Sequence, residues 1–190
     1  MRQHRQPCDS PDCSPEYEHK HHENKIVLNC GTGTGVSLPV SSAAPLCQSD
    51  LVVGTVRSAV PLWQPGLVVG TVTLDTRGFK KPTVKIDYSS VVSFRAGSFN
   101  FELEITFQLS RSCDNGPKIP LATWTYEREV ESDFTSSAEI EFKDPIAFTW
   151  CECHDCLGCC TYFVEVISID AEDIESASIT NVGINALAIG

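Results

Sequence analysis

Apolar and polar residues alternate along most of the chain after residue 25, and a period of two is typical of strands with one buried face. The clearest case is residues 99–109, where every second residue from Phe99 to Leu109 is apolar. This alternation predicts an antiparallel strand with one face in the core and one in water. The residues expected to point into the core are Phe101, Leu103, Ile105 and Phe107.

Turn signals separate further segments of the same kind. Residues 114–117, Asp-Asn-Gly-Pro, predict a turn, and residues 118–126 predict the strand that returns from it. Helical periodicity is absent. Further strands are predicted at 84–88, 91–94, 138–142, 146–150, 161–169 and 177–189. About eight to ten short strands with frequent turns predict an all-β fold, an antiparallel β-sandwich or jelly roll.

Residues 1–24 have a different character. They contain four of the five histidines, three prolines and two cysteines, without an apolar period. Such a composition cannot form a core, so we expect a flexible N-terminal arm at 1–24 and a folded body at 25–190. A fully extended arm would reach roughly 80 Å, far enough to cross a neighbouring subunit.

One hexapeptide, Leu-Val-Val-Gly-Thr-Val, occurs at residues 51–56 and again at 67–72. The simplest interpretation is two similar strands joined by a loop. The alternative is a long hairpin that projects from the body and carries Trp63 at its tip. Two copies do not make a solenoid.

Composition and charge limit the classes of partner. A chain of 190 residues with 42% hydrophobic and 21% charged residues suits one globular domain. Its net charge of −11 would repel phosphate backbones and anionic lipid, so neither nucleic acid nor a membrane surface is an expected partner. The sequence has no apolar run of roughly 20 residues and no apolar core of a secretory signal at its start.

Ten cysteines are many for a protein without a secretory signal, because disulfides persist only in oxidising surroundings. One explanation is a protein that folds inside the cell and meets an oxidising exterior after lysis. The other is that the thiols stay reduced and bind metal.

Two patterns suggest enzymes but fit them poorly. The glycine-rich residues 30–35 lead into a β-branched, proline-containing stretch and not a helix, so they do not form a phosphate-binding loop. We expect them instead to permit a bulge or a close backbone approach at a sheet edge. His154 is the only histidine of the body, and it lies among cysteines too close in sequence to be a typical catalytic base for one of them. Glu102 and Glu104 could form a pair of catalytic carboxylates, but they lie on the water face of their strand. No catalytic residue and no cofactor are therefore expected.

The segment 151–160 places five cysteines and a histidine in ten residues. Zinc or copper(I) could use Cys151, Cys153, His154, Cys156 and Cys159 as ligands. A thioredoxin-like redox site would need a βαβ context, which is missing. Disulfides within or between chains are favoured, because adjacent Cys159 and Cys160 point to opposite faces of a strand. The candidates for cross-links are Cys8, Cys13, Cys30, Cys47, Cys113, Cys151, Cys153, Cys156, Cys159 and Cys160.

Four blocks of sequence resemble an uncharacterised domain family of anaerobic spore-forming bacteria, from about residue 26 to the end. They are residues 28–39 (LNCGTGTGVSLP), 84–90 (VKIDYSS), 107–116 with 123–125 (FQLSRSCDNG and TWT), and 159–162 (CCTY). The plan is similar to that of endospore appendage subunits, which join a cysteine-bearing arm to a jelly-roll body without a signal peptide. The resemblance implies that Cys8 and Cys13 of the arm form disulfides with a neighbouring subunit, with Cys30 or Cys113 among the acceptors. The long histidine-rich arm, the repeated hexapeptide and the 151–160 cluster depart from the appendage pattern.

Together these observations predict a non-enzymatic structural subunit of a self-assembling, disulfide-cross-linked filament, with other copies of itself as the partner. Its expected location is extracellular or on the spore surface, without an N-terminal signal peptide. The alternative is a cysteine-rich protein that binds zinc or copper. A jelly-roll module that binds carbohydrate is a third class, supported by the fold alone.

Overall fold

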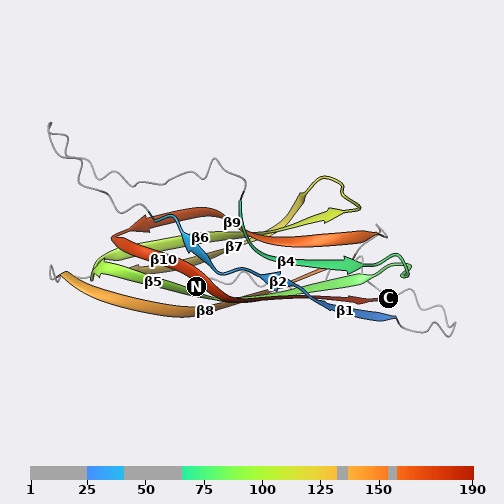
Figure 1. Ribbon diagram of the computed structural model, residues 1–190, viewed down its shortest axis with the longest axis horizontal. Coiled ribbons are helices and arrows are strands. Elements are labelled where there is room, and N and C mark those ends of the chain that lie inside the picture. Colours follow the sequence, from blue (N-terminus) through green and yellow to red (C-terminus); the bar gives the residue numbers. More distant parts are fainter. Residues whose placement is uncertain (1–24, 41–65, 132–136, 154–157) are drawn as a thin grey trace.

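A computed structural model describes residues 25–40, 66–131, 137–153 and 158–190 (Figure 1). These residues form ten strands and no helix. The strands are β1 (Ile26–Cys30), β2 (Thr32–Gly33), β3 (Val36–Leu38), β4 (Leu67–Asp75), β5 (Thr83–Ser98), β6 (Phe101–Cys113), β7 (Ile119–Val130), β8 (Ser137–Cys153), β9 (Cys159–Glu172) and β10 (Ile174–Ile189). None of the described residues belongs to a helix long and apolar enough to cross a membrane.

The strands form two antiparallel sheets that pack face to face, so the predicted β-sandwich is confirmed. One sheet, called here the β10 sheet, has the order β1-β10-β5-β8, with β3 also paired to β10. The other, the β9 sheet, has the order β2-β4-β9-β6-β7. The β9 sheet is the upper layer in Figure 1 and the β10 sheet the lower. The order β1-β10-β5-β8 facing β4-β9-β6-β7 is the arrangement of a jelly roll.

The core lies between the two sheets and follows the predicted alternation. Phe101, Leu103, Ile105 and Phe107 are all at most 3% exposed, which confirms the predicted inward face of β6. Tyr88 and Phe94 on β5 meet them from the opposite sheet: the rings of Tyr88 and Phe107 lie 6.2 Å apart, and those of Phe94 and Phe101 lie 5.6 Å apart. Alternation fixes which face is buried because a shift of one residue would turn every apolar side chain of a strand toward water.

Several strands are longer than predicted. The segments predicted at 84–88 and 91–94 form one strand, β5, and those at 138–142 and 146–150 form β8. Pro145 does not interrupt β8, because β8 is the last strand of its sheet and a missing N–H is tolerated on an open edge. Phe99, placed at the start of a strand by the pattern, lies in the turn before β6 and is 36% exposed. The first hexapeptide copy, residues 51–56, and Trp63 lie outside the described residues, whereas the second copy begins β4.

Side chains close one lateral side of the sandwich, where β7 and β8 are the last strands of their sheets. The ring of Trp124 on β7 stacks on that of Phe148 on β8, with centroids 4.0 Å apart. The Tyr126 hydroxyl donates a hydrogen bond of 2.7 Å to Asp144. These contacts join the two sheets where no strand continues either of them.

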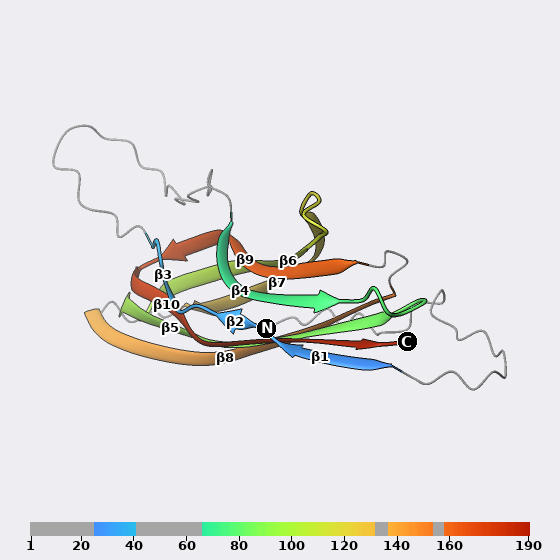
Figure 2. The same ribbon diagram turned by 45° about the vertical axis from the view of Figure 1, so that its right-hand side comes forward.

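The backbone of the glycine-rich segment closes the opposite side. The chain leaves β1 in the β10 sheet, forms β2 in the β9 sheet, and returns as β3 (Figure 2). Gly31 N–H donates to the Ile184 carbonyl at 2.8 Å in one sheet, and Thr34 N–H donates to the Val69 carbonyl at 3.0 Å in the other. A Cβ at Gly31 would collide with the Thr71 carbonyl and lie 2.6 Å from Ile184 Cγ2. The glycines therefore permit a close backbone approach at the edge, as predicted.

Candidate cross-linking site

Five of the six described cysteines lie at one end of the sandwich. Cys113 is the last residue of β6, Cys151 and Cys153 are at the end of β8, and Cys159 and Cys160 begin β9. Antiparallel pairing brings them together, since Cys153 lies opposite Thr83, the first residue of β5, and Cys113 lies opposite Cys160. Strands far apart in sequence thus place their cysteines at the same end.

Cys113 and Cys160 form a disulfide between neighbouring strands β6 and β9, with their Cα atoms 4.0 Å apart. Cys160 is 1% exposed, so this bond lies in the core. It closes a loop between residues 47 apart in sequence, for which chain entropy alone predicts a stabilisation of about 4 kcal/mol. Cys113 is therefore not available as an acceptor for another chain, contrary to what the resemblance implied.

Cys151 and Cys153 are also disulfide-bonded. They are two residues apart on β8 and so share the outer face of the β10 sheet, opposite Lys85 and Thr83. The Thr83 hydroxyl lies 3.9 Å from the Cys153 sulfur, within the range of a weak hydrogen bond.

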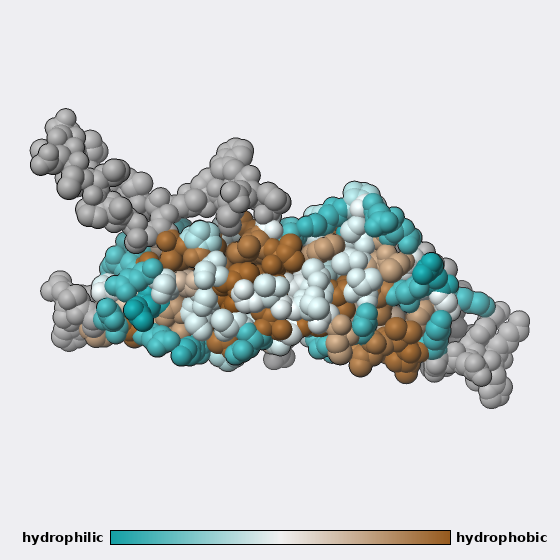
Figure 3. Space-filling model, viewed as in Figure 1, coloured by the Kyte–Doolittle hydropathy of each residue, from teal (hydrophilic) through white to brown (hydrophobic). Residues whose placement is uncertain are grey.

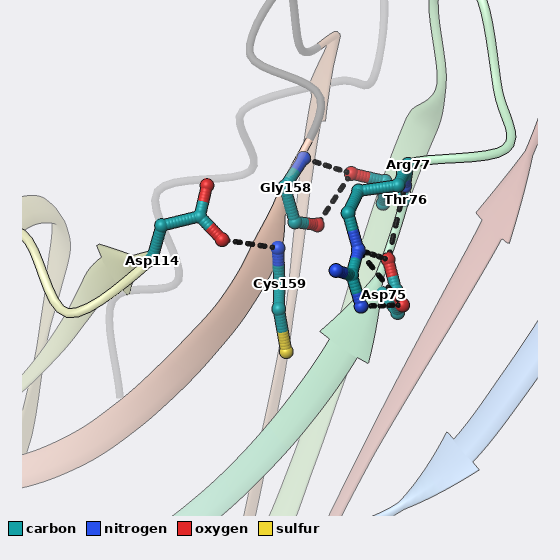
Figure 4. Close-up of polar contacts among 6 residues, drawn as sticks. All are labelled: Asp75, Thr76, Arg77, Asp114, Gly158 and Cys159. Atoms are coloured by element: carbon teal, nitrogen blue, oxygen red, sulfur yellow. Dashed lines mark hydrogen bonds and ion pairs between the residues drawn. The ribbon is translucent and has the colours of Figure 1, made fainter.

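Cys159 is a free thiol on the outer face of the β9 sheet and is half-buried. As alternation requires, it points away from its neighbour Cys160. Its backbone N–H donates to Asp114 Oδ1 at 3.0 Å, and the Asp114 N–H donates to the Cys159 carbonyl at 2.9 Å. From the other side, the Thr76 hydroxyl donates to the Gly158 carbonyl at 3.1 Å (Figure 4). Residues 158–159 are thus held from both sides, which fixes the position of the thiol.

An exposed ion pair lies beside this thiol. Asp75 is directly opposite Cys159 in the register of β4 and β9, and Arg77 Nη2 lies 2.6 Å from Asp75 Oδ2 (Figure 4). The hydrogen bonds from the Arg77 side chain and backbone lower the pKa of the Asp75 carboxyl to about 2. The hydrogen bond with Asp75 and the charge of that carboxylate in turn raise the pKa of Arg77.

Cys30 is the second free thiol among the described residues and is exposed. It ends β1 on the outer face of the β10 sheet, opposite Asn185. Cys30 and Cys159 therefore lie on the outer faces of different sheets, too far apart to bond within one subunit. Another chain could reach either of them.

The arrangement does not favour a metal centre. Cys151 and Cys153 are oxidised, and metal coordination requires thiolates. Along the described parts of the chain, no group of three or more histidine, cysteine or acidic side chains has the geometry to hold an ion. His154 and Cys156, together with Cys8, Cys13 and Cys47, lie outside the described residues.

A buried polar cluster near the disulfide was not predicted. Arg111 on β6 and Glu152 on β8 form an ion pair of 2.8 Å across the two sheets, with side chains 16% and 13% exposed. The Tyr162 hydroxyl donates to the same carboxylate oxygen at 2.8 Å, and burial, with the Glu152 charge, raises the pKa of Tyr162 strongly. The alternation that runs from Phe101 to Leu109 continues through Arg111 and Cys113, so the same pattern could have placed both inward.

Comparison with protein families gives one match. A family model described as Domain of unknown function (DUF4489) matches residues 24–189. A search of curated proteins gives no match to the chain.

Proposed function

The chain belongs to the family described as Domain of unknown function (DUF4489), and from its structure we propose that it is a structural subunit of a disulfide-cross-linked filament. One observation carries the proposal. Four of the described cysteines are disulfide-bonded, whereas the two free thiols among the described residues, Cys30 and Cys159, lie on the outer faces of different sheets, where another chain could reach them. A subunit that is already oxidised internally is suited to an oxidising exterior.

In this proposal, the N-terminal arm of one subunit reaches a neighbour, and Cys8 or Cys13 forms a disulfide with Cys30 or Cys159. Four of the cysteines at the end of the sandwich are already paired, so acceptors are few. Each such bond would turn a reversible contact into one that only reduction breaks. Contacts that join different surfaces of identical subunits do not pair off as in a two-fold dimer, and they give rings or open filaments.

The location follows from the same chemistry. Subunits made in a reducing cytosol would assemble there and oxidise once the cell opens, which accounts for the many cysteines. The similarity in plan to endospore appendage subunits supports a place on the spore surface. No enzymatic step is part of the proposal.

Electron microscopy of the purified full-length protein tests the function. We expect filaments after air oxidation that withstand heating in detergent and come apart when dithiothreitol is added. A chain without residues 1–24 should stay folded and monomeric, and Cys30→Ser/Cys159→Ser should lose resistance to detergent. A full-length protein that remains monomeric under oxidising conditions, or a truncated one that forms the same filaments, would overturn the proposal.

A further inference from the structure

The ionisable residues that the structure describes are distributed unevenly along the sandwich. The strand register brings six carboxylates together on the outer face of the β9 sheet, at the end opposite the cysteines. Glu102 on β6 lies opposite Glu129 on β7 and Glu172 on β9, and one step inward Glu104 lies opposite Glu127 and Asp170. We call these six residues the acidic array. Like charges directly opposite each other on neighbouring strands destabilise a sheet.

Lysines gather at the other end. Lys25 pairs with Gly190 through two backbone hydrogen bonds of 2.8 and 3.1 Å, and its ammonium lies 5.1 Å from the centre of the Phe79 ring. Lys80 and Lys81 follow Phe79 in the loop between β4 and β5, and both are exposed. None of these three lysines forms an ion pair with a residue that the structure describes. We call Lys25, Lys80 and Lys81 the lysine end.

The two surfaces are too far apart to neutralise each other within one molecule. The sixteen residues of β5 run from the lysine end to the other end, a span of roughly 50 Å. The Debye length at physiological salt is about 8 Å, so each surface acts only on what touches it. Figure 3 shows hydrophilic residues toward both ends of the molecule, and apolar ones both in the middle and in a patch near the right-hand end.

We propose that the acidic array of one subunit docks the lysine end of a second copy of this chain. Every copy carries both surfaces, so the charges are complementary between molecules and not within them. The neighbour's ammonium groups would offset the repulsion between the opposed carboxylates, and electrostatic complementarity of this kind guides encounter and fixes orientation. The contact joins two different surfaces, so it repeats head to tail. It rests on the proposed self-assembly and names the non-covalent contact that would align subunits before disulfides form.

The test uses full-length protein whose free thiols have been alkylated with iodoacetamide, so that no new disulfide can form. Sedimentation velocity should show concentration-dependent association in 50 mM NaCl, weakened about tenfold or more in 500 mM NaCl because salt screens exposed charges. Lys80→Glu/Lys81→Glu makes both surfaces acidic. Glu104→Lys/Glu127→Lys/Glu129→Lys/Asp170→Lys makes both basic, because it sets four lysines against the two remaining carboxylates of the array. We expect each variant alone to be monomeric in 50 mM NaCl.

An equimolar mixture of the two variants should associate again, because each then meets an opposite charge on the other. Arg95→Glu/Lys143→Glu, the same charge change on the outer face of the β10 sheet, is the matched control and should behave as the wild type. Wild-type association by either variant alone, or a mixture that stays monomeric, would overturn the docking contact. Filaments of oxidised, unalkylated wild-type protein are scored separately. If they form while the charge variants assemble normally, the docking inference fails and the proposed function stands; if they do not form, the proposed function fails.

Discussion

Neighbouring residues on one strand have opposite roles in this fold. Ile105 on β6 is fully buried, whereas Glu104 points outward and lies opposite Glu127 and Asp170. Each side chain is in the environment that the alternating sequence assigns to it. The pair therefore offers a matched comparison between a buried apolar contact and an exposed charge.

Replacing Ile105 with alanine should lower the free energy of unfolding by about 2–5 kcal/mol, because it leaves a cavity in a closely packed core. Glu104→Ala should cost little, since it removes one member of a row of like charges. Urea denaturation followed by circular dichroism measures both. Equal losses for the two variants would contradict the assignment of the faces.

The ion pair of Asp75 and Arg77 should make the stability of the fold depend on pH. The hydrogen bonds from Arg77 lower the pKa of Asp75 from its ordinary value of 3.8 to about 2. A lowered folded-state pKa means that the pair favours the fold above about pH 4, and that this contribution is lost as the pH falls toward 2. An NMR titration of the Asp75 carboxyl carbon should give this low midpoint, and Arg77→Gln should return it toward 3.8. A midpoint that Arg77→Gln leaves unchanged would assign the shift to another cause.

Among the elements, the segment that crosses between the sheets depends most on backbone space. Gly31 has the Thr71 carbonyl and the Ile184 side chain where a Cβ would lie, whereas a Cβ at Gly35 would meet only the Ile179 carbonyl, at 3.5 Å. Gly31→Ala should therefore destabilise the protein by about 1–3 kcal/mol, as overpacking does, and loosen β1 to β3. Gly35→Ala is the control and should be nearly neutral. Hydrogen exchange of the β1 amides, with urea denaturation, separates the two outcomes.

Alternation predicted the fold class and the inward face of β6, because both depend on local pattern. The lengths of the strands could not be predicted in the same way. Ser89 and Ser90 lie within β5 and Pro145 within β8, and local propensity treats such residues as breaks. Pairing of β5 with β8 and β10 along nearly its whole length supplies the hydrogen bonds that overrule this local preference.

The candidate site was predicted only in part. Sequence identified the cysteines and the opposite orientations of Cys159 and Cys160. It could not identify the partner of Cys160, because Cys113 is brought opposite it by the register of two strands distant in sequence. The same nonlocal register aligns the carboxylates of three strands in the acidic array, a feature that no single segment reveals.

At the scale of the whole molecule, the free thiols differ in their access to reagents. Cys30 is exposed at the edge of the β10 sheet, Cys159 is half-buried on the β9 sheet, and Cys113 and Cys160 are bonded to each other. Native, unreduced protein treated briefly with iodoacetamide should be alkylated fastest at Cys30, more slowly at Cys159, and not at Cys113 or Cys160. Peptide mapping by mass spectrometry measures the order. Rapid alkylation of Cys113 would show that its bond to Cys160 does not form.

The bond between Cys113 and Cys160 also determines how the subunit responds to mechanical load. If the chain is pulled from its two ends, force passes through this bond and bypasses the 47-residue span that it encloses. That span has a contour length of roughly 170 Å. In single-molecule pulling, the chain should extend by this additional length only after a reductant is added. All of β7 and β8 lies within the span, so one edge strand of each sheet would stay shielded from tension while the rest of the sandwich is drawn apart. A fibre built from such subunits would stretch by a limited length per subunit and then resist.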